Sequence, residues 1–229
     1  MGSEAQSPGG SEPETRGVFE GLLGAYAEGL FPMAGPDGRI GWYDPDPRGI
    51  FGLEEGGLRV SRSLRQRVRA VGRFEVTCDH AFGAVIRACA EPRADQEDEG
   101  TWIDDRIVGA YTALFEAGHA HSIEAWRGGE LVGGLYGVHL RGLFAGESMF
   151  SRPDAGGTDA SKVCLVHLWH HLRGMGAVVL DTQFWTPHLG RLGCVEVSRS
   201  DYRGLLRTAM SADIGWGSFD ADRAVHEVG

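Results

Sequence analysis

Residues 143–162 read LFAGESMFSRPDAGGTDASK, and the fold predicted for the rest of the chain is built outward from this stretch. Leu143 and Phe144 begin an apolar strand that leads to a single carboxylate, Glu147. A glycine-rich loop follows, and residues 159–162 have the pattern of the start of an apolar helix. Burying an unpaired charge costs several kcal/mol. The acid at this strand end therefore indicates a site, although a loop cap or a partner for Arg152 remains an equal alternative here.

The segments around this stretch predict a mixed α+β chain. Strands are expected at 122–126 and 130–138, because Gly128 and Gly129 are a hairpin signal between them. A helix expected at 160–174 leads to a short apolar strand at 178–180. An antiparallel meander followed by a glycine loop, a helix and a strand is the outline of an acetyltransferase-like (GNAT) mixed sheet.

The chain is predicted to have three parts. Residues 1–16 are expected to be a disordered tail, because residues 1–13 are rich in Gly, Ser, Pro and Glu. Residues 17–61 are expected to form a small N-terminal α/β domain, with a helix at 18–29 and strands at 39–43, 49–51 and 58–60. Residues 62–229 are expected to form the GNAT-like domain. Its other predicted elements are helices at 61–71 (with Ser61 or Ser63 as N-cap), 82–90, 105–117, 187–192 and 201–210, and strands at 74–78 and 195–197.

Composition limits the class of protein. The chain has 229 residues, 42% of them hydrophobic, and no apolar run near the ~20 residues that span a bilayer, so we expect a cytoplasmic protein with no membrane partner. Its four cysteines are widely spaced, which favours reduced thiols over a zinc ribbon or a disulfide framework.

Charge is unevenly distributed along the chain. The net charge of −10 disfavours nucleic-acid binding over the whole surface. Residues 59–73, however, hold six arginines and no acid. Rows of arginine bind phosphates without reading bases, so this helix is either a solvated basic face or a contact for a phosphate backbone.

Most motifs of metal or nucleophile chemistry are incomplete. His167 and His171 have metal-ligand spacing but belong to no H-E-x-x-H pattern, so no metal is predicted. The loop before Lys162 lacks the glycine of a phosphate-binding P-loop, and no cofactor is expected.

Asp181 and Gln183 alternate at the end of a predicted strand, so both side chains are expected on one face. The amide oxygen could then accept an N–H from an attacking amine while the carboxylate holds the amide or relays a proton. Two solvated polar side chains are the alternative.

An ordered set of segments resembles the bacterial leucyl/phenylalanyl-tRNA–protein transferases. The segments are Ala25-Tyr26, Phe31-Pro32, WYDPDPR at 42–48, SRSL at 61–64, GTWI at 100–103, GHAHSIE at 118–124, LVGGLYGV at 131–138, FAGESMFSR at 144–152, Ala160-Ser161-Lys162, Asp181-x-Gln183, Leu192-Gly193 and Arg199-x-Asp201-Tyr202. The resemblance implies transfer of Leu, Phe or a similar apolar residue from aminoacyl-tRNA to a protein that begins with Arg or Lys. The product would be marked for N-end rule degradation. It also implies the acetyltransferase-like fold, with neither metal nor coenzyme A.

The resemblance implies roles for individual residues. It implies catalytic roles for Asp181, Gln183 and Glu147. The apolar pocket for the donor side chain would comprise Tyr111, Leu135, Phe144, Leu165, Leu168 and Leu172. Trp102 would stack on the 3′-terminal adenosine, near Met33 and Trp42, and Arg62, Arg65 and Arg69 would meet the acceptor stem. The expected partners are thus the 3′ end and acceptor stem of aminoacyl-tRNA and proteins or peptides with N-terminal Arg or Lys, bound by a monomer.

Several segments depart from the family pattern. Leu168 and Leu172 stand where aromatic residues are common, and the loop at 153–159 is longer than usual. Met33 replaces a usual tryptophan, and residues 184–187 read Phe-Trp-Thr-Pro where the family usually has Val-Leu-Asn-Asp. These changes leave the choice of donor open. Two other functions fit the same fold: a coenzyme-A-dependent N-acyltransferase, for which residues 151–160 lack the pyrophosphate loop, and an inert tRNA- or N-degron-binding protein, which the three polar site residues disfavour.

Overall fold

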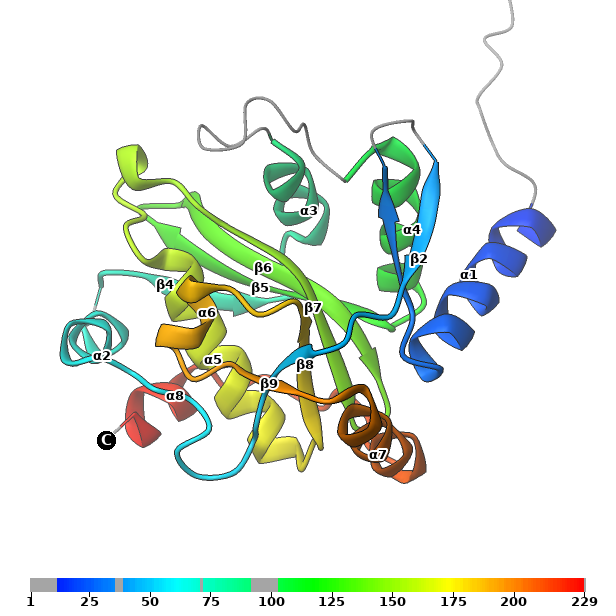
Figure 1. Ribbon diagram of the computed structural model, residues 1–229. Helices are drawn as coiled ribbons and strands as arrows, with labels where there is room; N and C mark the ends of the chain where they lie inside the picture. The colour runs from blue at the N-terminus through cyan, green and yellow to red at the C-terminus, as the bar shows by residue number, and fades with distance from the viewer. Residues whose placement is uncertain (1–11, 36–38, 71, 92–102, 229) are drawn as a thin grey trace, which may run out of the picture.

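A mixed seven-stranded sheet forms the centre of the computed structural model, which describes residues 12–35, 39–70, 72–91 and 103–228 (Figure 1). The strands in spatial order are β4 (Glu75–Cys78), β5 (Ala120–Arg127), β6 (Glu130–Leu140), β7 (Leu143–Ser151), β8 (Val179–Gln183), β3 (Arg48–Phe51) and β9 (Val195–Val197). Among the strand pairs of the described residues, only β7 and β8 are parallel, and helix α5 (Ala160–Met175) makes the crossover that a parallel pair requires. This order confirms the predicted α+β class, with an antiparallel meander leading into a GNAT-like parallel pair.

Helices cover both faces of this sheet (Figure 1). One face carries α5 with α2 (Arg62–Arg69) and α8 (Ala221–Glu227), and the other carries α1 (Glu12–Ala27), α3 (Phe82–Ala90) and α4 (Asp105–Glu116). Successive strand residues point to opposite faces, so Leu135 joins the core under α5 and Tyr136 joins the core under α3. The remaining elements are the hairpin strands β1 (Phe31–Ala34) and β2 (Ile40–Tyr43), the 3-10 turn η1 (Pro153–Ala155), α6 (Pro187–Arg191) and α7 (Arg199–Ser211).

Glycines in β6 allow its neighbours to approach closely. A Cβ atom at Gly133 would overlap the side chain of Ala160, and one at Gly137 would overlap the ring of Phe144. The glycine-rich segment 131–138 is therefore a packing surface for α5 and β7.

The predicted N-terminal sheet is wrong in two respects. Residues 58–60 form no strand, and β3 does not complete a small separate sheet. Instead, β3 pairs with β8 on one side and β9 on the other, because Ile50 and Phe51 are apolar and are buried only within the large sheet. The domain boundary near Ser61 remains a prediction.

Most other elements agree with their predicted ranges to within a few residues. Ser61 is confirmed as the N-cap of α2, where its Oγ accepts the N–H of Leu64 at 3.2 Å. Helix α1 begins at Glu12, so it includes residues 12–16 of the predicted tail; Pro13 near its start suits the first turn of a helix. Helix α8 was not predicted. The turn expected at 36–38 lies outside the described residues, and within those residues no helix is long and apolar enough to cross a membrane.

Candidate active site

A cavity of about 970 Å³ lies where β7 and β8 separate. Their pairing ends at Ala145 opposite Asp181, although β7 continues to Ser151 and β8 to Gln183. The lining side chains come from β1, α3, β6, β7, α5, β8 and α6 and from the turn after β8. They include Phe31, Met33, Leu135, Glu147, Leu165, Leu168, Gln183 and Phe184.

Glu147 enters this cavity from a β-bulge. Gly146 pairs with Gly137 and Ser148 pairs with Tyr136, so Glu147 is the extra residue of β7 and has no partner position on β6. Bulges of this kind redirect a side chain and are common beside active sites. The strand end identified in the sequence therefore presents its one carboxylate to the cavity.

Two tyrosines bind the carboxylate of Glu147. The hydroxyl of Tyr26 donates to Oε1 at 2.7 Å, and that of Tyr111 donates to Oε2 at 3.0 Å. Burial raises the pKa of Glu147 to about 7, against the opposing effect of the two hydroxyl hydrogen bonds. This side chain therefore changes its charge near neutral pH.

Gln183 lines the same cavity from the end of β8, where it lies in a strained turn. Its φ is +59°, and the N–H of Phe184 donates to the carbonyl of Thr182 at 2.6 Å across it. A non-glycine residue in this conformation costs about 1–3 kcal/mol and persists only where its surroundings enforce it. The side chain of Gln183 is buried, and its Nε2 has no hydrogen-bond partner among the described residues. A buried donor without a partner costs about 1–3 kcal/mol, so this amide is suited to bind a substrate.

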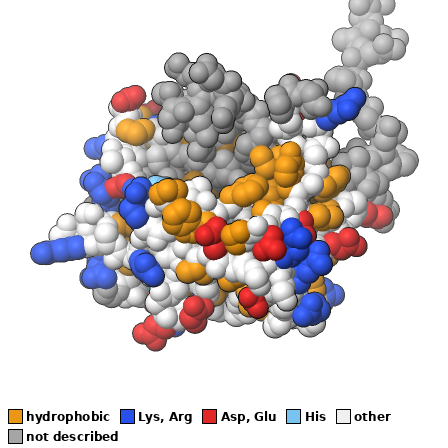
Figure 2. Space-filling model, viewed as in Figure 1, with side chains coloured by type: hydrophobic (Ala, Val, Ile, Leu, Met, Phe, Trp, Pro, Cys, Tyr) orange, Lys and Arg blue, Asp and Glu red, His pale blue; other side chains and the backbone are white. Residues whose placement is uncertain are grey.

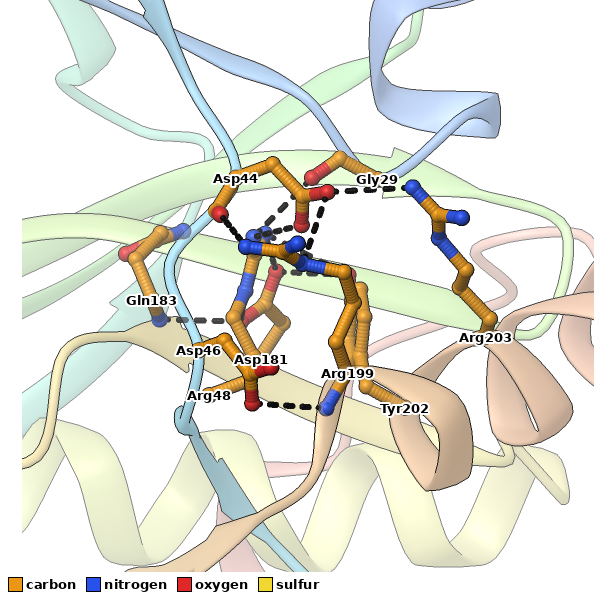
Figure 3. Close-up of polar contacts among 9 residues, drawn as sticks. All are labelled: Gly29, Asp44, Asp46, Arg48, Asp181, Gln183, Arg199, Tyr202 and Arg203. Carbon is orange, nitrogen blue, oxygen red and sulfur yellow. Dashed lines mark hydrogen bonds and ion pairs between the residues drawn. The ribbon is translucent and has the colours of Figure 1, made fainter.

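Asp181 lies behind Gln183 and does not line the cavity. Its carboxylate accepts hydrogen bonds from Arg48 Nε at 2.9 Å and Nη2 at 2.7 Å, and from the Tyr202 hydroxyl at 2.8 Å (Figure 3). The prediction that Asp181 and Gln183 share one face of a strand is wrong, because the positive φ of Gln183 breaks the alternation. Asp181 points to Arg48 and Tyr202, and the Gln183 side chain points away from them (Figure 3).

Comparison with known proteins gives the family. The family model described as leucyl/phenylalanyl-tRNA protein transferase matches residues 53–207, and the model of that family's N-terminal domain matches residues 20–46. The chain belongs to the leucyl/phenylalanyl-tRNA–protein transferase family.

Relatives with that name align along most of the chain. The leucyl/phenylalanyl-tRNA–protein transferase of Paramagnetospirillum magneticum is 49% identical over 206 residues, which are 89% of this chain and 93% of that protein. Those of Afipia carboxidovorans and Novosphingobium aromaticivorans are 50% and 52% identical, over 90% and 82% of this chain and 88% and 69% of their own. Among solved structures, L-PGS from Bacillus licheniformis is 14% identical, with a TM-score of 0.40 over 75% of this chain and 55% of its own.

Half of the donor pocket that the family resemblance implied lines the cavity. Leu135, Leu165 and Leu168 form apolar wall there. The other three predicted pocket residues lie elsewhere: the Tyr111 hydroxyl binds Glu147, the Phe144 ring lies 5.4 Å from that of Trp216, and Leu172 is in the core. Leu172 follows Leu165 by about 10 Å along α5, which takes it beyond the cavity.

The residues predicted to contact tRNA lie on two surfaces, apart from Trp102, which is outside the described residues. Met33 lines the cavity, and Trp42 is 52% exposed on the β1–β2 hairpin, where Figure 2 shows a concentration of hydrophobic side chains. Tyr43, Phe184 and Trp185 are also exposed, and Phe31 packs against Tyr43 and Phe184.

The second surface is helix α2, on the side of the molecule where Figure 2 shows many Lys and Arg side chains. Arg62 and Arg69 are exposed and Arg65 is half-buried, and none of the three has an ion-pair partner among the described residues. Arg67 differs, because it pairs with Asp159. Three arginines of the predicted basic face therefore remain available for phosphates.

Three residues of the site received no role from the sequence. These residues are Tyr26, Arg48 and Tyr202, and each was noted as a member of a segment that resembles the family, without a role of its own. One signal was present: Arg48 begins the apolar strand Arg48–Phe51, and a charge that enters an apolar strand requires a buried partner. The sequence alone did not identify that partner as Asp181.

Proposed function

We propose that this chain transfers an apolar aminoacyl group from aminoacyl-tRNA to the N-terminal α-amine of an acceptor protein or peptide. The observation that carries the proposal is that one cavity holds both the Gln183 Nε2, which has no hydrogen-bond partner in the part of the chain that the structure describes, and the titrating carboxyl of Glu147. An amide can orient an amine, and a carboxylate with a pKa near 7 can accept its proton. Membership of the transferase family supports this chemistry.

The reaction needs no covalent enzyme intermediate, because the aminoacyl ester of the tRNA is already activated. The amine nitrogen attacks the ester carbonyl, the bond from that carbon to the ribose oxygen breaks, and the ribose oxygen gains a proton. Glu147 takes the proton that the amine loses and returns it to the ribose oxygen, so the carboxylate is regenerated. The Gln183 amide oxygen orients the amine, and its N–H donates to the carbonyl oxygen as negative charge develops there.

Positioning supplies much of the rate. Leu135, Leu165 and Leu168 hold the donor side chain, and correct placement of two reactants is worth about 7–11 kcal/mol. Asp181 acts indirectly in this scheme, because its Oδ1 accepts the backbone N–H of Gln183 at 2.8 Å.

The remaining parts of the proposal concern partners. Arg62, Arg65 and Arg69 contact the acceptor stem through its phosphates, and Trp102 and Met33 contact the 3′ end. The acceptors begin with Arg or Lys, and the product is a substrate of N-end rule degradation. The protein acts as a cytoplasmic monomer.

A transfer assay tests the proposal. Purified protein is mixed with tRNA charged with labelled Leu, Phe or Met and with peptides that begin with Arg, Lys, Asp or Glu. We expect label on the Arg and Lys peptides from Leu or Phe. The proposal fails if no peptide is labelled, and binding of acetyl-CoA by calorimetry in that case would instead support a coenzyme-A-dependent acyltransferase.

A further inference from the structure

Arg48 is a buried cation with all its contacts inside the protein. It is 1% exposed, and its side chain makes a two-point contact with Asp181, which is 0% exposed. Its third nitrogen, Nη1, donates to the carbonyl of Gly29 at 2.9 Å. The guanidinium also lies 4.9 Å from the ring centroid of Phe31 and 4.4 Å from that of Tyr202. These rings and hydrogen bonds hold the planar guanidinium of Arg48 in a single orientation. Arg48 therefore fixes the orientation of the carboxylate that it binds.

That carboxylate in turn holds the turn that carries Gln183. Asp181 Oδ1 accepts both Arg48 Nε at 2.9 Å and the backbone N–H of Gln183 at 2.8 Å. The backbone of β3 packs against the same turn: Gly49 pairs with Gln183, and a Cβ atom at Gly49 would lie 2.7 Å from the backbone of Phe184. The positive φ of Gln183 is thus enforced from β3 and from Asp181 together.

Helix α7 holds the segment that delivers Arg48. The backbone N–H of Arg199 donates to Asp46 Oδ1 at 3.0 Å, and its Nη2 donates to the Asp44 carbonyl at 2.8 Å. Arg203 Nη2 donates to Asp44 Oδ2 at 3.1 Å. Figure 3 shows these contacts as one connected group around Asp44, Arg48 and Asp181.

We propose that Arg48 is a positioning residue of aminoacyl transfer: it holds Asp181, Asp181 holds the backbone of Gln183, and the Gln183 amide is thereby fixed toward the cavity. This inference rests on the proposed transferase function and adds a residue to it. It also gives Asp181 a holding role, because each of its carboxylate oxygens is already bound by two donors.

A double-mutant cycle separates positioning from general structural support. Arg48→Lys is the chosen variant, because it keeps the charge beside Asp181 but cannot reproduce the two-point contact. We expect Arg48→Lys to lower the single-turnover rate at least tenfold, with unchanged KM for aminoacyl-tRNA. In a Gln183→Ala background, the same change should cost less than twofold, because the group that Arg48 positions is already absent. Equal losses in both backgrounds, or a normal rate for Arg48→Lys, would overturn the inference.

Hydrogen exchange and a control variant complete the test of the positioning role. Amide hydrogen exchange at Gln183 should become at least tenfold faster in Arg48→Lys, while exchange at Val138 in the core of β6 stays unchanged; unchanged exchange at Gln183 would also overturn the inference. This readout needs no activity, so it decides the matter if the Gln183→Ala protein is too slow to assay. Arg207→Lys is the matched control, since it makes the same substitution at an exposed position of α7 outside this group of contacts, and its rate should stay within twofold of wild type.

These measurements also distinguish failure of the proposed transferase function from failure of the positioning role of Arg48. Absence of transfer by the wild-type chain counts against the proposed function, and hydrogen exchange still reports on Arg48. Normal transfer by both wild type and Arg48→Lys counts against the positioning role alone.

Discussion

Replacing Glu147 with glutamine tests whether its carboxylate accepts the proton of the attacking amine. Glutamine keeps the shape of the side chain, and its amide oxygen can still accept one of the two tyrosine hydrogen bonds, but it cannot take a proton. A positioned general base contributes about 10²–10⁴-fold to a rate, so we expect Glu147→Gln to slow transfer by at least two orders of magnitude at pH 8. Binding of aminoacyl-tRNA should change little.

The pH dependence of this loss follows from the pKa of Glu147. Burial raises that pKa to about 7, so roughly 9% of the side chains are ionised at pH 6 and roughly 91% at pH 8. The ratio of the wild-type rate to the Glu147→Gln rate should therefore rise about tenfold between these values. Taking the ratio cancels the ionisation of the acceptor amine, which titrates near pH 7.7–8.0 in both reactions.

The assay is single-turnover transfer of labelled Leu to an Arg peptide, with enzyme in excess, at several values from pH 6 to 8.5 and constant ionic strength. A ratio that stays flat or falls with increasing pH would refute the role of Glu147 as a proton acceptor. A falling ratio would instead indicate that the protonated carboxyl donates a hydrogen bond.

Three other predictions follow from the site and the core. Gln183→Ala and Asp181→Ala should each lower transfer at least a hundredfold while tRNA binding, measured by filter retention, stays within threefold; near-normal transfer by both would remove them from the mechanism. Arg65→Glu should raise the KM for aminoacyl-tRNA and reduce the slope of log K against log salt by about one, whereas Arg67→Ala, already paired with Asp159, should change the slope less. Burial lowers the pKa of His139 and of His167 to about 4, so between pH 6.5 and 4 the unfolded chain binds protons that the folded chain does not. The free energy of unfolding should fall in this window by roughly 3 kcal/mol per histidine. Glu147 titrates in the opposite sense, so urea unfolding is best followed in the Glu147→Gln chain, and a pH-independent midpoint would contradict the prediction.

The sequence predicted elements better than it predicted contacts between them. Local patterns were sufficient for α3, for the N-cap of α2 and for the β5–β6 hairpin, because each depends on residues close in the chain. They failed for β3, whose partners lie about 130–150 residues later. A four-residue strand carries no local signal that selects the central sheet over a small one nearby.

At the candidate site, too, the sequence predicted which residues matter better than it predicted their contacts. Glu147 and Gln183 were found because a polar residue at the end of an apolar strand can be recognised from the sequence alone. The sequence did not predict the direction of their side chains, because a bulge redirects Glu147 and a positive φ redirects Gln183. Family resemblance named Phe144, Tyr111 and Leu172 as pocket residues, but pattern matching does not report which side of a buried ring or helix faces a cavity.

The placement of β3 has a consequence for the order in which the protein can be made. Arg48 leaves the ribosome 133 residues before its partner Asp181, and the strands that flank β3 end at Gln183 and Val197. Until those strands are synthesised, the early segment carries an apolar strand with two open edges and a cation that lacks its two-point partner Asp181. We therefore expect residues 17–61 not to fold alone, and the cavity to take its final shape only when β8 and β9 have emerged. A nascent chain stalled before β8 would contain the elements from α1 to the crossover helix α5. It would still lack the strand that carries Asp181 and Gln183 into the cavity region.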